Sequence, residues 1–273
     1  MIRVAGIQMG AVKGKADNVQ KVRAMLDAAG RLKPRPDLIC LPELFSYIPG
    51  LEDNYERIEE IAEGLDGPIA AMLSETARRL GISIVAGSYL HKSQGRHYNT
   101  CLVFGPDGKL LGTYSKVHLF DTPDFQESRF VEAGTRVTVI ETELCKIGII
   151  ICYDIRFPEL LRTLVLRGAD VIFCPAAFPI AAPSPGYDHW EILTRAAALQ
   201  NMVYLVAVNQ IGYRDPFYYF GRSVIVDPWG IEIAKAPNKE CIFTAELDLE
   251  YLNEMREIRS PLKHRKPDIY DVG

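Results

Sequence analysis

The segment KIGIIICYDIRFPELL at residues 146–161 decides the fold of this chain. It opens as a run rich in isoleucine, which is typical of a strand buried on both faces. The run ends at Cys152, and Pro158 follows as a residue type favoured in the first turn of a helix. We expect a strand over 146–151 and a helix over 158–167. A strand that leads into a helix is the basic unit of an α/β protein.

The same alternation of apolar strands and amphipathic helices covers the rest of the chain. Further helices are expected at 18–32, with Asp17 or Asn18 as the cap, at 69–80, ended by Gly81, and at 189–199. Further strands are expected at 3–9, 37–41, 82–87, 98–104, 110–114, 137–140, 171–174, 204–208, 223–226, 231–234 and 241–247. The turns GPDG at 105–108 and DPWG at 227–230 predict two hairpins. Because no linker divides the sequence, we expect one domain over 1–273, in which the charged residues 256–273 form a C-terminal arm.

Composition narrows the class of protein. The chain has 273 residues, 24% of them charged, and a net charge of −4, so it has no basic surplus for nucleic acid or an anionic membrane. Its six cysteines are scattered without a C-x-x-C pair, and the spacing fits no zinc template. No apolar run has the length of a spanning helix or the form of a signal peptide. We expect a cytoplasmic enzyme that needs no metal or other cofactor.

Three apolar strands each end on a reactive side chain. These are Glu43, Lys116 and Cys152. Sites in α/β sheets form at the carboxyl ends of strands, so a carboxylate, an ammonium group and a thiol that meet there would suit acyl transfer. Taken singly, the cysteine is also typical of an inert core thiol, and the two charges of solvated loops. His118 is the nearest candidate for a cysteine–histidine pair, but its context matches no such pair.

Short motifs around these residues resemble a known family. The strongest are LPELF at 41–45, YSKVHLF at 114–120 and ICYDIRFPEL at 151–160. The others are FQES at 125–128, DHWE at 188–191, RAAALQN at 195–201, VDPWG at 226–230 and HRKPDIY at 264–270. On this ordered set the chain resembles the nitrilase superfamily of carbon–nitrogen hydrolases, closest to its omega-amidase and deaminated-glutathione-amidase branches. The resemblance implies a four-layer α-β-β-α sandwich of two mixed sheets.

The resemblance also implies a role for each reactive residue. Glu43 matches the family's general base, Lys116 its transition-state lysine and Cys152 its nucleophile. Glu127 matches a second glutamate of the pocket, the alternative being a surface charge beside Arg129. The backbone N–H of Tyr153 is expected to complete the oxyanion site, and the neighbouring ammonium group to make the thiol ionise more easily.

The walls of the pocket are expected from the loops after Glu43 and Cys174 and from the start of the helix at 189. The aromatic candidates there are Tyr47, Phe178, His189 and Trp190, for which packing at a sheet edge is the alternative. The acid end of a substrate is expected to meet a cation such as Arg156 or Arg195, unless these two are structural ion-pair partners.

The implied activity is a cysteine-dependent amidase that hydrolyses a small carboxylated amide through a thioester. The alternatives are hydrolysis of N-carbamoyl amines or amino acids on the same triad, and an inactive family member that serves as a scaffold. Nitrile-cleaving members carry Cys-Trp-Glu at the nucleophile, whereas this chain has Cys152-Tyr153-Asp154, which favours amides.

We also expect a homodimer or a higher homo-oligomer. In this family two sandwiches join through the helices that match residues 158–168 and 189–199. Leu160, Leu161, Leu164 and Val165 make the first of these more apolar than a solvated helix needs to be. The charged tail would then cross to the partner.

Overall fold

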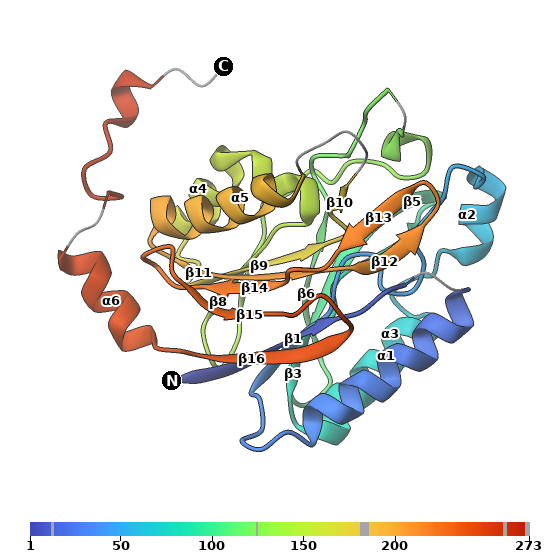
Figure 1. Cartoon of the computed structure of the whole chain (residues 1–273), viewed down its shortest axis with the longest axis horizontal. Coiled ribbons are helices and arrows are strands. Elements are labelled where there is room, and N and C mark those ends of the chain that lie inside the picture. Colours follow the sequence, from blue (N-terminus) through green and yellow to red (C-terminus); the bar gives the residue numbers. More distant parts are fainter. Residues whose placement is uncertain (12–13, 124, 181–185, 259–260, 271–273) are drawn as a thin grey trace.

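The computed structural model describes residues 1–11, 14–123, 125–180, 186–258 and 261–270. Two β-sheets face each other, and helices cover the outer face of each (Figure 1). Helices α1 (Lys15–Gly30) and α3 (Pro68–Leu80) lie on one side, and α4 (Pro158–Leu166) and α5 (Gly186–Asn201) on the other. The predicted four-layer sandwich of two mixed sheets is confirmed.

The first sheet has seven strands in the described part of the chain. Its order is β16 (Cys241–Leu247), β1 (Ile2–Gln8), β2 (Leu38–Cys40), β3 (Ser83–Val85), β5 (Arg96–Phe104) and β4 (Tyr89–Ser93), and β6 (Leu110–Ser115) also pairs with β5. Strands β1, β2 and β3 are parallel, and the other pairings are antiparallel. Because β2 and β6 belong to this sheet, it carries both Glu43 and Lys116 at strand ends.

The second sheet has six strands among the described residues. Its order is β15 (Glu232–Lys235), β14 (Val224–Val226), β11 (Tyr204–Asn209), β9 (Val171–Ala176), β8 (Lys146–Ile149) and β7 (Val139–Glu141). The central strands β8, β9 and β11 are parallel. Strand β8 ends two residues before the expected position, and Cys152 begins a short 3₁₀ helix, Cys152–Arg156, that leads into α4.

A small third sheet was not predicted. It pairs β10 (Pro179–Ile180), β13 (Phe217–Phe220) and β12 (Ile211–Arg214) in antiparallel fashion. Strand β4 and the helices α2 (Tyr55–Ile61) and α6 (Leu249–Ile258) were not predicted either. Apart from α6, which has ten residues, these elements are short and carry too few residues for a clear periodicity.

The core extends on both sides of each sheet because the central strands are buried on both faces. Val4 of β1 packs into the cluster between the two sheets, together with residues such as Phe173 of β9. Its neighbour Ala5 belongs instead to the cluster beneath α1 and α3, which also holds Leu26 and Leu73. This double burial explains why the strand sequences read as continuous apolar runs.

Local signals located several boundaries correctly. Gly81 has φ +62° directly after α3, and Gly168 has φ +97° after α4, as expected of glycines that end helices. The expected cap of the first helix was wrong, because α1 begins at Lys15 and Gly14 is its N-cap. Asn18 lies inside the helix, where its buried side chain donates to the carbonyl of Ser46 at 3.0 Å.

The C-terminal segment leaves the body of the molecule after α6 (Figure 1). Residues 256–258 of the expected arm belong to this helix, and 267–269 form a single 3₁₀ turn. Ile269 is 78% exposed. Residues 259, 260 and 271–273 of the arm lie outside the described residues.

Candidate active site

The three reactive side chains meet at one edge of the sandwich. Glu43 follows β2, Lys116 follows β6, and Cys152 opens the 3₁₀ helix after β8. The first two come from one sheet and the third from the other. Because the sheets pack face to face, their strand ends bring all three side chains to the wall of a single cavity.

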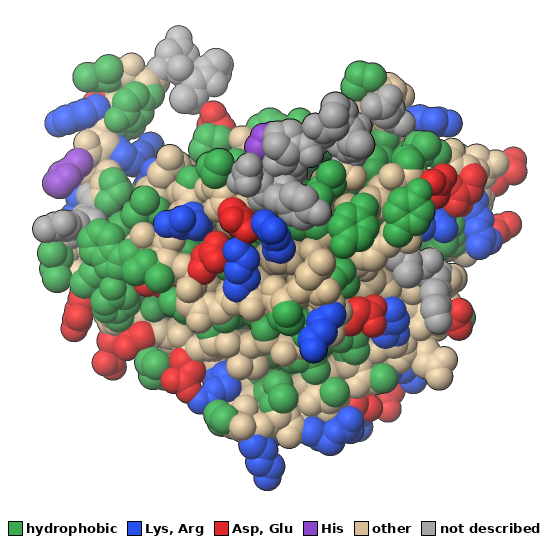
Figure 2. Space-filling view, viewed as in Figure 1, with side chains coloured by type: hydrophobic (Ala, Val, Ile, Leu, Met, Phe, Trp, Pro, Cys, Tyr) green, Lys and Arg blue, Asp and Glu red, His purple; other side chains and the backbone are tan. Residues whose placement is uncertain are grey.

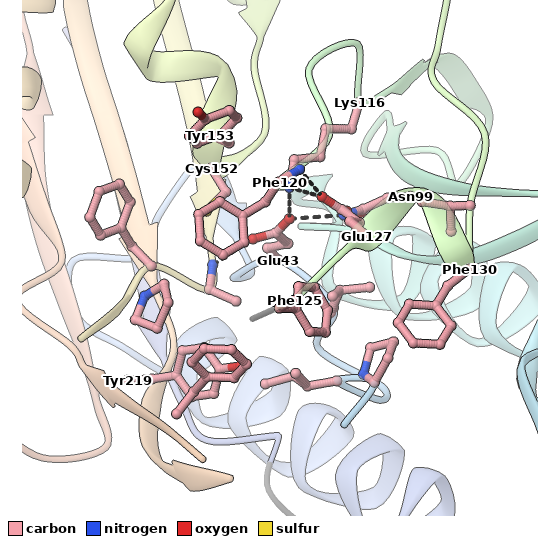
Figure 3. Close-up of a pocket in the computed structure, with 18 of the residues that line it drawn as sticks. Glu43, Asn99, Lys116, Phe120, Phe125, Glu127, Phe130, Cys152, Tyr153 and Tyr219 are labelled. Atoms are coloured by element: carbon pink, nitrogen blue, oxygen red, sulfur yellow. Dashed lines mark hydrogen bonds and ion pairs between the residues drawn. The ribbon is translucent and has the colours of Figure 1, made fainter. Parts of the chain in front are cut away.

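Lys116 lies between two carboxylates. Its Nζ donates to Glu43 Oε1 at 2.9 Å and to Glu127 Oε2 at 2.8 Å (Figure 3). All three residues are buried, with Glu127 only 7% exposed, so Glu127 is not a surface charge. Burial acts to lower the pKa of Lys116, but Glu127 and Glu43 outweigh it and hold that pKa well above its ordinary value. The ammonium group is therefore charged at neutral pH.

Further donors fix the two carboxylates. The backbone N–H of Ala177 donates to Glu43 Oε2 at 2.7 Å, and that of Phe120 donates to Glu127 Oε2 at 2.8 Å. The side-chain amide of Gln210 donates to the backbone carbonyl of Glu43 at 2.7 Å. These contacts leave each carboxylate little freedom to rotate.

Asn99 is a site residue that the sequence analysis missed. Its Nδ2 donates to Glu43 Oε1 at 2.8 Å and to Glu127 Oε1 at 3.0 Å, so one amide bridges both carboxylates. The residue is 1% exposed, and its Oδ1 has no hydrogen-bond partner among the described residues. Strand β5 also carries Arg96, His97 and Thr100, so its sequence carries no clear signal that the carboxamide of Asn99 is buried at a site.

Cys152 sits at a strained corner of the backbone. Its φ is +49°, a left-handed conformation that costs energy for any residue except glycine. Its backbone N–H donates to the sulfur of the buried Cys174. The backbone N–H of Tyr153, the next residue in the chain, has no hydrogen-bond acceptor among the described residues. A substrate oxygen beside Cys152 would find this donor unoccupied.

Burial and two neighbouring charges set the pKa of the Cys152 thiol. Burial and the neighbouring Glu43 raise the pKa of the thiol well above its usual value, and Lys116 offsets only part of this rise. The ammonium group of Lys116 favours ionisation of the thiol, as expected, but burial and Glu43 outweigh it. The thiol hydrogen-bonds to Glu43, and this carboxylate is placed to take its proton.

The cavity has a volume of about 180 Å³ and a largely apolar wall that includes several aromatic rings. Tyr153, Phe178 and His189 line it, as the sequence analysis predicted. Residues that it did not predict include Phe120, Phe125, Phe130, Phe217 and Tyr219. Figure 3 shows Tyr219 across the cavity from Cys152.

Two of the expected wall residues do not line the cavity. The hydroxyl of Tyr47 donates to Asp53 at 2.9 Å and accepts from Arg214 at 3.2 Å. Trp190 is fully buried, and its indole N–H donates to the carbonyl of Arg222 at 2.8 Å. Its ring lies 5.3 Å from that of Phe178, so Trp190 supports the wall from behind.

The two candidate cations occupy different places. Arg156 lines the cavity and is exposed, with its guanidinium 5.2 Å from the ring of Phe178 and 5.8 Å from that of Tyr153. Among the described residues, it pairs with no carboxylate. Arg195 lies outside the cavity wall, and its Nε donates to the carbonyl of Gly230 at 2.9 Å. Arg195 therefore holds the turn between β14 and β15.

A model of the carbon-nitrogen hydrolase family matches residues 3–257. The chain belongs to this family. It is 37% identical over 280 residues to the omega-amidase NIT2 of Danio rerio, covering 99% of this chain and 97% of that protein. It is 34% identical over 276 residues to the omega-amidase NIT2 of Homo sapiens, with the same coverage. The predicted carbon–nitrogen hydrolase of the amidase type is thereby confirmed.

Solved structures of carbon–nitrogen hydrolases share the fold. One from Helicobacter pylori G27 superposes with a TM-score of 0.92 at 28% identity, covering 98% of this chain and 97% of that one. Nit3 of Saccharomyces cerevisiae, described as a member of branch 10 of the nitrilase superfamily, superposes with a TM-score of 0.86 at 30% identity, with the same coverage. The resemblance to the nitrilase superfamily is confirmed.

Two further features concern the described part of this hydrolase. No three His, Cys, Asp or Glu side chains there gather in a way that could hold a metal ion. No helix in that part combines the length and apolar character needed to cross a membrane.

Proposed function

We propose that the chain hydrolyses the terminal amide of a small carboxylated amide to an acid and ammonia. One observation carries the proposal. Lys116 bridges Glu43 and Glu127 on the wall of the cavity that Cys152 also lines. A protonated thiol beside a carboxylate, with an ammonium group next to both, provides a nucleophile, a base and an electrostatic partner for an oxyanion.

In the first half of the reaction the substrate is acylated onto the enzyme. The sulfur of Cys152 attacks the amide carbon as Glu43 takes the thiol proton. The ammonium group of Lys116 and the backbone N–H of Tyr153 stabilise the negative oxygen of the tetrahedral intermediate. Glu43 then returns the proton to the leaving nitrogen, so that ammonia departs and a thioester remains.

In the second half water releases the acid. Glu43, again a carboxylate, takes a proton from the water as its oxygen attacks the thioester carbon. The thiol leaves with the proton that Glu43 holds, which restores the resting enzyme. Glu127 and Asn99 keep Lys116 and Glu43 in place through both halves. An inactive scaffold would not need this buried charge network, because buried charges are costly.

The carboxylate of the substrate binds at Arg156. This guanidinium lies at the exposed part of the cavity wall without a carboxylate partner among the described residues, and the rings of Tyr153 and Phe178 flank it. A planar guanidinium suits bidentate contact with a carboxylate. Arg195 does not take this role, because its Nε already bonds Gly230.

Ammonia release from a panel of amides tests the substrate class. The panel contains monoamides of dicarboxylic acids, the matching neutral amides with methyl in place of carboxylate, and N-carbamoyl amines. Arg156→Leu is expected to lower kcat/KM for the carboxylated amides by about tenfold and to leave the neutral amides unchanged. Arg195→Leu, the matched control, keeps this preference. If an N-carbamoyl amine is hydrolysed faster than every amide in the panel, the proposal is wrong and the carbamoyl alternative is supported.

We also propose that the chain forms a homodimer through α4 and α5. The residues first thought to face a partner, Leu160, Leu161, Leu164 and Val165, are buried within the chain. The outer face of these helices nevertheless exposes other apolar side chains, namely Leu166 at 49%, Ile192 at 64% and Leu199 at 45%.

Exposed apolar side chains around α6 also support contact with a second copy of the chain. Hydrophobic side chains gather there, over α6 and the segment after it (Figure 2), and Ile258 and Tyr270 are 68% and 55% exposed. The tail would cross to the second copy. Light scattering that gives a mass of 30.6 kDa at micromolar concentration would refute the dimer. The cytoplasmic location stays a prediction.

A further inference from the structure

A further buried carboxylate lies close to the nucleophile in the chain and has no part in the mechanism above. Asp154 is fully buried, two residues after Cys152. Its Oδ2 accepts from the hydroxyl of Tyr114 at 2.7 Å and from the backbone N–H of Ile151 at 2.9 Å. Its Oδ1 accepts from the backbone N–H of His118 at 2.9 Å and lies 2.8 Å from His118 Nδ1. Both oxygens are thus fully engaged.

The partners of Asp154 flank Lys116 in the sequence. Tyr114 precedes Lys116 by two residues at the end of β6, and His118 follows it by two. Strand β6 belongs to the first sheet, whereas the 3₁₀ helix that holds Asp154 follows β8 of the second sheet. The carboxylate therefore links the segment that carries Lys116 to the segment that carries Cys152.

Packing supports the same link. The rings of His118 and Phe157 stack with centroids 3.6 Å apart and an angle of 6° between their planes. Phe157 directly follows the 3₁₀ helix, so a second contact joins the same two segments. With Oδ1 accepting, Nδ1 of His118 carries the proton, and the stack holds the ring in the plane that this hydrogen bond needs.

The link matters because neither segment defines the distance between sulfur and ammonium by itself. Lys116 is held by Glu43, which follows β2 of the first sheet, and by Glu127 of the 3₁₀ helix Glu127–Arg129. Cys152, by contrast, sits at a strained corner with φ +49°. A strained corner persists only where its surroundings hold it in place. The hydrogen bond from Ile151 to Asp154 spans this corner.

We propose that Asp154 is a positioning residue which, through Tyr114 and His118, holds the sulfur of Cys152 in register with the ammonium group of Lys116. The proposal rests on the proposed function for its meaning in catalysis. It also gives a role to the Asp of the CYD motif and to the His of the YSKVHLF motif, neither of which contacts the cavity.

Two substitutions of His118 separate the hydrogen bond from the stacking. His118→Asn keeps a side-chain N–H near the position of Nδ1 but loses the ring, and His118→Phe keeps the ring but loses the donor. If the link through Asp154 depends on the His118 hydrogen bond, His118→Asn keeps kcat within about threefold. His118→Phe then lowers kcat about tenfold or more, and KM is unchanged in both variants. The reverse order would assign His118 to packing alone and overturn its place in the proposal.

Substitutions at the other two residues test the centre of the link. Asp154→Asn replaces one acceptor oxygen with an NH₂ group, which would face the N–H or O–H donors that now bond the carboxylate. The expected result is a fall in kcat of about 100-fold. Tyr114→Phe removes one of the donors and is expected to cost about tenfold in kcat. The matched control is Tyr204→Phe, which removes a buried hydroxyl that bonds Asp248 far from the cavity and leaves kcat unchanged. If Asp154→Asn does not fold, Tyr114→Phe and the His118 pair still decide.

Alkylation of Cys152 by iodoacetamide tests the position of its sulfur relative to Lys116 without any substrate. Mass spectrometry gives the rate at Cys152, with the partly exposed Cys241 as an internal reference in the same sample. The Tyr114→Phe and His118→Phe variants are expected to slow labelling of Cys152 about tenfold and to leave Cys241 unchanged. If no amide is hydrolysed but this labelling pattern is found, the proposed function is wrong and the positioning role of Asp154 is supported. Unchanged labelling and unchanged kcat in both variants would overturn the proposal that Asp154 positions Cys152.

Discussion

Replacing Asn99 with leucine tests whether a single amide holds the two carboxylates of the site in place. The change keeps the volume of the side chain and deletes both N–H groups, at 2.8 Å from Glu43 and 3.0 Å from Glu127. Each carboxylate keeps Lys116 and one backbone donor, on Ala177 or Phe120, so neither is left without partners. What is lost is their fixed position relative to each other.

The magnitude follows from the contacts. Two hydrogen bonds to charged acceptors contribute about 3–6 kcal/mol together. Removing the buried Oδ1, which has no partner among the described residues, recovers about 1–3 kcal/mol of desolvation. We expect Asn99→Leu to lower the free energy of unfolding by about 2–3 kcal/mol. A base and an ammonium group displaced by a fraction of an ångström are expected to lower kcat about 100-fold.

Asn201→Leu is the matched control. Asn201 is also buried, also has an Oδ1 without a partner, and donates to the carbonyl of Ala197 on α5 at 2.8 Å. It lies outside the wall of the cavity, so its substitution is expected to change stability slightly and kcat not at all. Urea unfolding and ammonia release on both variants give the comparison. Equal loss of kcat in the two, or wild-type kcat in Asn99→Leu, would refute the reasoning.

Asn99→Asp sharpens the test through charge. A third carboxylate at about 3 Å from the other two would cost about 5 kcal/mol per neighbour at an effective dielectric constant of 20. The new carboxyl group therefore stays protonated at neutral pH and donates one hydrogen bond in place of two. Its activity is expected to lie between wild type and Asn99→Leu and to fall as pH rises. A pH profile parallel to that of wild type would contradict this.

Four further outcomes follow from the same site. Cys152→Ala is expected to abolish turnover while the fold is kept, and a covalent acyl adduct found by mass spectrometry on any other cysteine would contradict the assignment. Lys116→Arg is expected to be nearly inactive, because a guanidinium cannot replace a compact ammonium group between two carboxylates, and near-wild-type ammonia release would remove Lys116 from the mechanism. Burial raises the pKa values of Cys101 and Cys174, so above an ordinary thiol pKa the unfolded chain loses protons that the folded chain keeps, and the free energy of unfolding falls as pH rises above about 9. Cys101→Val is expected to flatten this fall by up to about 1.4 kcal/mol per pH unit, and an unchanged slope in urea unfolding would refute it. A monoamide of a dicarboxylic acid is expected to release ammonia at least about tenfold faster than the matching nitrile, a difference of about 1.4 kcal/mol, and equal rates would mean that the CYD motif was misinterpreted.

Glu43, Lys116, Cys152 and Glu127 were recognisable from the sequence because each stands in a motif next to a strand or turn. The order of strands and helices was also readable, since apolar runs, glycines such as Gly81 and turns such as GPDG act through neighbouring residues. Cavity residues such as Phe178 were predicted in the same way, from the loops that follow strands.

The function of Asn99 and Asp154 emerged only in the folded chain. Asn99 bonds carboxylates 56 and 28 positions away, and Asp154 bonds a hydroxyl 40 positions away. No local pattern specifies such partners, because periodicity reports that a side chain is buried but not what it is buried against. Tyr47 and Trp190 were misplaced for the same reason, since a ring can face a cavity or support its wall with one sequence pattern.

The sequence by itself determined the alternation of strands and helices and the identity of the reactive side chains, because these depend on residues close together in the chain. Only the tertiary structure decided the net shift in the pKa of Cys152, which burial and Glu43 raise although Lys116 lowers it. It also decided that the leucines of α4 pack inward. Both depend on the sum of burial and charge from two sheets that meet in space, and electrostatic energies follow distance and solvent exposure, not separation along the chain.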